Sequence, residues 1–165
     1  IESSPSGNPH GMVLSLACGL MPEYLAGVIA PERLHLWGIR DLDEGERKLM
    51  VQTGVHFLSP EQTRRNWHSL LNKLGQNVLL SFDIDSVEPA EAPATRTPVP
   101  RGFRTQEALE LVSLVARSRR VVALDVVEFH PDLDLQNKTL DLSLEVIRRV
   151  VTAQSANGYS AAAGC

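Results

Sequence analysis

Two apolar runs separated by one helical pattern are the feature that most constrains the fold. Val78 to Asp83 and Val121 to Val127 are nearly continuous in β-branched and other apolar residues. Such runs are typical of parallel strands that are buried on both faces. Thr105 to Ser118, which lies between them, carries apolar residues near helical spacing. A strand, a crossover helix and a second strand predict a parallel pair with a right-handed connection.

The rest of the chain repeats this alternation. We expect further strands over Leu34 to Ile39 and Val55 to Leu58. Further helical patterns cover Met12 to Leu20, Glu44 to Thr53, Pro60 to Leu74 and Leu140 to Val151. In the last of these, one face of the helix carries Leu140, Leu144, Ile147 and Val151. The pattern as a whole predicts an α/β fold with a mostly parallel sheet.

Composition narrows the class of protein. The 165 residues suit one domain, or one lobe of a larger one. The net charge is −4 without a basic stripe, so we expect neither a nucleic acid nor an anionic membrane as partner. No run of about 18 apolar residues occurs, so we expect no transmembrane helix. We interpret Cys18 and Cys165 as free thiols in a reducing compartment.

Asp83 and Asp85 are the strongest candidates for chemistry. They stand at the end of an apolar strand, and residues two apart on an extended chain point to the same side. Close like charges repel unless a cation or a donor lies between them, and divalent metals favour such oxygen ligands. A pair that caps the amides of the following loop is the alternative. The loop from Ser86 to Gly102 is long and rich in proline, which is typical of functional loops.

Other candidates are weaker. Asp125 and Glu128 close the next apolar strand, where carboxylates either add to an acidic site or bond a loop. His10, before an apolar helix, is an acid–base candidate or a surface residue. The acidic run that contains Asp43 and Glu46 is a solvated helix start or part of a site at a strand end. We interpret His130 as structural.

Four sets of residues together resemble the arginase and agmatinase (ureohydrolase) family. The stretch Ser81 to Asp85, with Pro89, Ala92 to Thr95 and Thr97-Pro98, is similar to a metal-ligand motif of that family. Two further motifs resemble those of arginases in particular. They are Ser6-Gly7-Asn8 with His10-Gly11, and Gly38 to Asp41 with Asp43, Gly45 and Glu46. Asp125 to Glu128 with Pro131 resembles the late Asp-x-x-Glu motif. The resemblance runs from about Ser4 to Val151.

The resemblance implies a fold and an activity. The fold would be a three-layer αβα arrangement around a mostly parallel sheet. Residues 1–154 would form the C-terminal part of that domain, without its N-terminal part, and residues 155–165 a flexible tail. The activity would be hydrolysis of L-arginine to L-ornithine and urea at two Mn²⁺ ions that activate a shared water. A cytoplasmic enzyme that forms trimers or hexamers at full length is implied as well.

The resemblance also implies residue roles. Asp83 and Asp85 would be metal ligands. His10 would shuttle a proton near the leaving amine, and Glu128 would pair with the guanidinium. Substrate contacts would come from Ser6 and Asn8 at the α-carboxylate, from Asp43 with Glu46 at the α-amino group, and from Thr97 in the pocket.

Several departures change what we expect of this chain. The earlier motifs that supply the family's other metal ligands are absent, so we expect the chain alone to be inactive. Ser86, Glu88, Arg96 and Arg101 replace residues usual in the family. If the family's glycines at 96 and 101 hold positive φ, each Arg costs about 1 kcal/mol.

Two alternative functions therefore stay open: a non-catalytic arginase-like protein, and a related amidine hydrolase such as an agmatinase or a formimidoylglutamase. A half-domain would also leave a sheet edge and an apolar face open, so we expect the chain to self-associate or to be poorly soluble.

Overall fold

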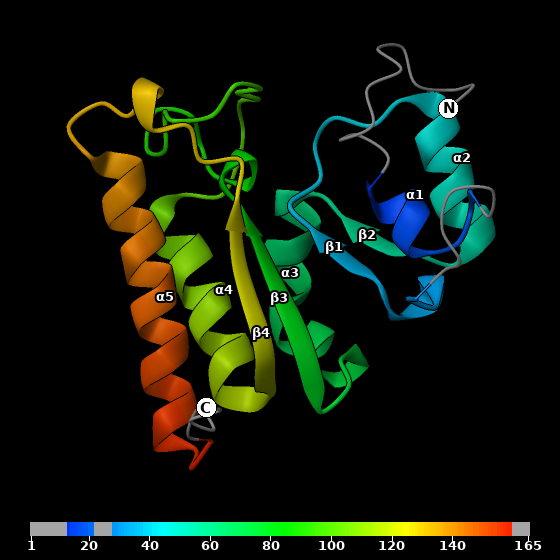
Figure 1. The fold of residues 1–165 in the computed structure, drawn as a ribbon. Coiled ribbons are helices and arrows are strands. Elements are labelled where there is room, and N and C mark those ends of the chain that lie inside the picture. The colour runs from blue at the N-terminus through cyan, green and yellow to red at the C-terminus, as the bar shows by residue number, and fades with distance from the viewer. Residues whose placement is uncertain (1–12, 22–27, 160–165) are drawn as a thin grey trace. The chain divides into compact units, whose positions relative to one another are not determined.

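A computed structural model describes residues 13–21 and 28–159. The chain divides into two compact units, Ile1–Ser59 (unit 1) and Pro60–Cys165 (unit 2). Both are built from helices and a pair of parallel strands, so the predicted α/β class with parallel pairing is confirmed (Figure 1). None of the described helices is long and apolar enough to cross a membrane.

Unit 1 contains short elements. Its helices are α1 (Val13–Ala17), a 3-10 turn (Pro31–Arg33) and α2 (Glu44–Thr53), and its strands are β1 (His35–Trp37) and β2 (His56–Leu58). The two strands pair in parallel, with Leu36 opposite Phe57. Helix α2 ends at Gly54, whose φ of 80° is a conformation that glycine adopts without strain. Both strands and α1 are shorter than the patterns predicted.

Unit 2 carries the longer elements. It begins with α3 (Pro60–Leu70) and a 3-10 turn (Leu71–Lys73), followed by β3 (Asn77–Asp83) and a second 3-10 turn (Ile84–Ser86). After the long loop come α4 (Thr105–Ser118), β4 (Arg120–Val127), a 3-10 turn (Pro131–Leu133) and α5 (Lys138–Ala156). Strands β3 and β4 are parallel neighbours, with an irregularity between Val78 and Leu79. Helix α4 has the bounds that the pattern predicted.

One face of the β3–β4 sheet is covered and the other is bare. On the covered face, helices α4 and α5 contact β4 (Figure 1). Phe82 is buried, as are Val112, Val115 and Val146 of the two helices. On the other face, Leu79 is 63% exposed and Val122 is 57% exposed. The prediction that both strands are buried on both faces is therefore wrong here, because no described element of unit 2 covers the second face.

Helix α5 has two apolar surfaces. Leu142, Val146 and Val150 are buried in the core. The four residues predicted to share a face do so, but that face is open: their exposed fractions are 37% for Leu140, 55% for Leu144, 41% for Ile147 and 57% for Val151. We call these four residues the α5 stripe. Because α5 continues to Ala156, Ser155 and Ala156 are not part of a tail, and residues 160–165 lie outside the described part.

Candidate functional site

Asp83 and Asp85 lie where β3 ends and the 3-10 turn begins. The Asp83 carboxylate accepts the N–H of Asp85 at 2.8 Å, and the Ser86 hydroxyl donates to the Asp83 carbonyl at 2.6 Å. The turn is thus capped by the side chain of Asp83, as in the alternative interpretation of the pair. A carboxylate has about four lone-pair sites, so capping an amide is compatible with a role as a metal ligand.

The Asp85 carboxylate is held by two threonines from the long loop. The hydroxyls of Thr95 and Thr97 donate to different oxygens of Asp85. Thr95 is buried, with 5% of its surface exposed. Hydrogen bonds from neighbouring hydroxyls fix the orientation of a carboxylate, and carboxylates that bind metals are commonly hydrogen-bonded in this way. Thr97, predicted to bind substrate, therefore contacts Asp85 in this structure.

The long loop is packed firmly despite its prolines. Val87, Ala92 and Ala94 have exposed fractions of 1%, 0% and 0%. A bridge joins Val87 to Phe103 at the end of the loop. A Cβ on Gly102 would lie 2.5 Å from the Val87 carbonyl carbon, so only glycine fits beside this bridge. The loop thus presents Thr95 and Thr97 from a fixed backbone.

An ion pair between α3 and α4 holds the same end of the loop. Arg64 donates to both carboxylate oxygens of Glu107, at 2.8 and 2.9 Å, and to the Gly102 carbonyl at 2.9 Å. The bond from Arg64 lowers the pKa of Glu107 below its usual range, helped by the Arg104 amide. Nearby, the Thr105 amide bonds Glu91 and lowers the pKa of that carboxyl in the same way.

Ala94 connects the loop after β3 with the segment after β4. Its amide donates to the Thr139 hydroxyl at 3.1 Å, and its carbonyl accepts the amide of His130 at 2.9 Å. Thr139 is fully buried at the start of α5. Hydrogen bonds through Ala94 therefore join the two loops at the carboxyl end of the sheet.

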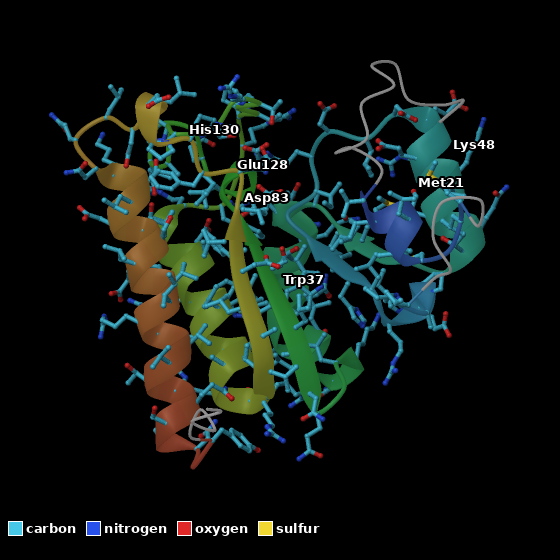
Figure 2. All side chains as sticks on the ribbon, viewed as in Figure 1. Met21, Trp37, Lys48, Asp83, Glu128 and His130 are labelled. Atoms are coloured by element: carbon cyan, nitrogen blue, oxygen red, sulfur yellow. The ribbon has the colours of Figure 1, made fainter. Side chains whose placement is uncertain are left out.

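Glu128 lies beside this junction in a strained conformation. Its backbone φ is 59°, a value that residues other than glycine rarely adopt. Such strain persists where the surrounding structure imposes it, often at functional sites. The Glu128 carboxylate is 3.8 Å from Nε2 of His130, and Arg96 donates to Nδ1 of the same ring at 3.1 Å. Figure 2 shows Asp83, Glu128 and His130 at the same end of β3 and β4.

Arg96, which bonds His130, places a cation next to this end of the sheet. Its backbone φ is not positive, however, whereas Arg101 has a φ of 69°. The expected backbone cost therefore applies to Arg101 and not to Arg96.

Asp125 takes a different position from the other carboxylates. It is opposite Ser81 in the sheet, and the Ser81 hydroxyl donates to it at 2.5 Å. Both residues are exposed on the bare face, within the strands and not at their ends. Asp125 therefore has a partner on the neighbouring strand and stands apart from the strand-end carboxylates.

Asp43 and Glu46 belong to unit 1 and form a capping box at the start of α2. The Asp43 carboxylate accepts the Glu46 amide at 2.8 Å, and the Glu46 carboxylate accepts the Asp43 amide at 3.1 Å. This is the helix-start interpretation of these acids. Ser6, Asn8 and His10 lie outside the described residues.

The donors present fit part of a divalent metal site. Asp83 and Asp85 offer the carboxylate oxygens that Mg²⁺ and Mn²⁺ accept. Within residues 13–21 and 28–159, however, no three His, Cys, Asp or Glu side chains converge as a metal cage. Two carboxylates cannot complete the coordination of two ions, each of which takes about six ligands. The residues described therefore offer two carboxylates and no complete metal site.

Sequence reasoning gave no role to Ser81 or to the hydroxyl of Thr95, and it treated His130 as structural only. A signal existed for His130, because it follows Glu128 by two residues. No local signal pairs Thr95 with Asp85, which is ten residues away.

Comparisons with known proteins agree on one family. Residues 1–152 match the arginase family. The arginase of Saccharomyces cerevisiae is 35% identical over 158 residues, which cover 83% of this chain and 47% of that protein. The native structure of the Bacillus caldovelox arginase matches with a TM-score of 0.82 and 30% identity, over 90% of this chain and 55% of that chain. The Entamoeba histolytica arginase in complex with L-ornithine matches with a TM-score of 0.80 and 29% identity, over 90% and 54%.

These matches extend over most of this chain but only about half of each relative. The matched region includes the end of β3, the long loop and the segment after β4. The predicted fold class is confirmed by the structural matches, which are arginase folds. The chain belongs to the arginase family.

Proposed function

We propose that this chain supplies the Asp83–Asp85 part of a metal-dependent site that hydrolyses the guanidinium group of L-arginine to give L-ornithine and urea. One observation carries the proposal: Asp83 and Asp85 both lie at the end of β3, and the Asp85 carboxylate accepts the hydroxyls of Thr95 and Thr97. Carboxylates that bind metals are commonly held by hydrogen bonds of this kind, which fix their orientation.

Mn²⁺ is the metal we propose, with Asp83 and Asp85 among its ligands. When bound, a pair of such ions lowers the pKa of a shared water and polarises the group it attacks. Because the described residues offer only part of the coordination, we expect the chain alone to hold metal weakly and to be inactive.

The remaining residues would act on the substrate. Glu128 would pair with the guanidinium cation, a charge-assisted contact for which its fixed backbone suits it. Ser6 and Asn8 would bind the α-carboxylate, Asp43 with Glu46 the α-amino group, and Thr97 would line the pocket while it orients Asp85. His10 would pass a proton to the leaving amine. A cytoplasmic location and a trimer or hexamer of the whole protein belong to the same proposal.

A second candidate is a non-catalytic arginase-like protein. Arg96 favours it, because its guanidinium bonds His130, whose ring lies beside Glu128. A resident cation there competes with the cationic group of the substrate that Glu128 would bind. This second candidate would be supported if a protein that combines this chain with the remaining metal ligands bound Mn²⁺ but released no urea from L-arginine.

Paramagnetic broadening of NMR signals by Mn²⁺ tests the metal proposal directly, because it detects weak sites. We expect Mn²⁺ to broaden the amide signals of residues 83–86 and 95–97 in the wild-type chain. Asp83→Ala should abolish this local broadening. Asp141→Ala, which removes an exposed carboxylate on α5, is the matched control and should leave it intact. Equal broadening in wild-type protein and Asp83→Ala would refute the assignment of the ligand.

A further inference from the structure

Arg96 selects one tautomer of the His130 ring. The Nε–H of its guanidinium donates to Nδ1 of His130 at 3.1 Å. A guanidinium keeps all its protons in a protein and has no acceptor, so Nδ1 has to be the bare, accepting nitrogen of the ring. The one N–H of the imidazole is then at Nε2. A single hydrogen bond therefore decides which nitrogen of His130 can donate to a further partner.

The N–H selected in this way faces the Glu128 carboxylate. Nε2 of His130 is 3.8 Å from Oε2 of Glu128. This separation is longer than a hydrogen bond, but such contacts are often long in a site without its ligand and tighten when the ligand binds. The other tautomer would place the lone pair of Nε2 against the anion. Arg96 therefore determines whether His130 attracts or repels Glu128.

Backbone contacts hold both partners in place. The His130 amide donates to the carbonyl of Ala94, which is fully buried two residues before Arg96. The long loop thus bonds His130 twice, once through its backbone and once through the Arg96 side chain. Glu128 has a φ of 59°, a strained value that its surroundings impose. The carboxylate and the ring therefore extend from backbone positions that are fixed relative to each other.

The cation of Arg96 does not neutralise Glu128. Within the part of the chain that the structure describes, the Arg96 guanidinium bonds the His130 ring and no carboxylate. Arg96 and Glu128 contact different nitrogens of the ring, and exposed charges that do not touch interact weakly in salt solution. A carboxylate that accepts one N–H keeps other lone pairs. The arrangement is therefore compatible with a cationic ligand on Glu128.

We propose that His130 is a positioning residue for Glu128 and that Arg96 acts through it by setting its tautomer. The Nε2–H of His130 closes on Oε2 of Glu128 and leaves Oε1 to a guanidinium cation. This inference deepens the proposed function and rests on it for the last step, the pairing of Glu128 with the guanidinium group of the substrate. The tautomer of His130 depends on neither metal nor substrate, so the two claims can fail separately.

NMR of the chain labelled with ¹⁵N in its histidines tests the tautomer, because protonated and bare ring nitrogens have widely separated shifts. At a pH of about 8, where ordinary histidines are neutral, we expect His130 in the Nε2–H form. Its signals are assigned by their absence from His130→Asn. Arg96→Met removes the donor and should lower the ratio of Nε2–H to Nδ1–H forms about fivefold, the effect of one ordinary hydrogen bond. Arg101→Met removes another exposed arginine of the same loop and should leave the ratio unchanged.

Titration with the guanidinium ion tests the consequence for Glu128. The ¹³C signal of its carboxyl group reports binding, and an ionic strength of about 1 M, where the Debye length is about 3 Å, screens charges that are not in contact. We expect Arg96→Met to weaken binding several-fold under these conditions and Arg101→Met to leave it unchanged. Tighter binding by Arg96→Met would mean that Arg96 competes with the ligand, and it would overturn the inference.

Two further results would contradict the inference. One is a wild-type His130 ring with its proton on Nδ1, and the other is an unchanged tautomer ratio in a folded Arg96→Met variant. If Arg96→Met does not fold, Glu128→Gln decides, because it should shift the Nε2 signal of His130 and a constant signal would exclude the contact. A Glu128 carboxyl that does not respond to guanidinium, while His130 keeps the Nε2–H form, would refute the proposed role of Glu128 and not the tautomer.

Discussion

Both faces of the β3–β4 sheet carry apolar side chains, but these side chains have very different surroundings. Helices α4 and α5 cover one face, where Phe82 is 6% exposed and Val146 of α5 is fully buried. The other face leaves Leu79 63% exposed. An apolar sequence pattern thus predicts buried side chains, and the structure shows on which face of the sheet they are buried. We therefore expect the side chains on the covered face to contribute much more to the stability of the chain than those on the bare face.

The largest expected effect comes from placing a charge on each face. Val146→Asp buries an unpaired carboxylate, and we expect it to cost at least about 4 kcal/mol and to prevent folding. Val122→Asp, on the bare face, should change the free energy of unfolding by about 0.5 kcal/mol or less. Urea denaturation measures the value for Val122→Asp, and far-UV circular dichroism shows whether Val146→Asp folds at all. Similar losses would mean that the second face is also buried in solution.

A smaller effect is expected at the end of the long loop. Gly102→Ala forces a Cβ against the backbone of Val87, and overpacking of this kind costs about 1–3 kcal/mol. Gly75→Ala is the matched control, because its Cβ would meet only the Asn77 carbonyl at 3.7 Å. Thermal unfolding should show a clear loss for the first variant and almost none for the second. If Gly102→Ala were as stable as Gly75→Ala, the loop would not be packed as described.

Arg101→Gly should stabilise the chain. Arg101 holds a φ of 69°, which costs a residue with a Cβ about 1 kcal/mol relative to glycine. Arg96→Gly is the counterpart, and it should slightly destabilise because position 96 has no positive φ and glycine adds entropy to the unfolded chain. Chemical denaturation of both variants, compared with the wild type, decides whether the expected signs are opposite.

The smallest effect concerns pH. The folded pKa of Glu107 is lowered, chiefly by Arg64, so its stabilising contribution is present above the ordinary carboxyl pKa of about 4.3. That contribution is lost as the pH falls from there through the lowered folded pKa. A partly exposed pair of this kind contributes about 1 kcal/mol or less. The wild type should therefore lose more stability than Glu107→Gln between pH 5 and the acid limit; parallel curves would exclude the pair as a source of acid sensitivity.

The fold was largely predictable from local patterns. Helix α4 has its predicted bounds because its apolar periodicity and its turn residues agree. The α5 stripe was also visible in the sequence, but periodicity cannot say which of two apolar surfaces of a helix packs in the core. Leu142, Val146 and Val150 do so here, a choice made by contacts with α4 and β4.

The candidate site was predictable only in part. Asp83 and Asp85 were found because they end an apolar strand and match a family motif. The hydroxyl contacts of Thr95 and the carbonyl of Ala94 that accepts the His130 amide depend on how the loop folds back, which local patterns do not encode. The strain at Glu128 is likewise a property of the surrounding structure.

The most direct test of the central claim, that this chain holds only part of a metal-dependent site, is its metal content after Mn²⁺ loading and desalting, with urea release from L-arginine assayed on the same sample. We predict substoichiometric Mn²⁺ and no urea, because Asp83 and Asp85 cannot complete the coordination of two ions. Two tightly held Mn²⁺ ions per chain together with urea release would contradict the account, since this chain would then provide a complete site.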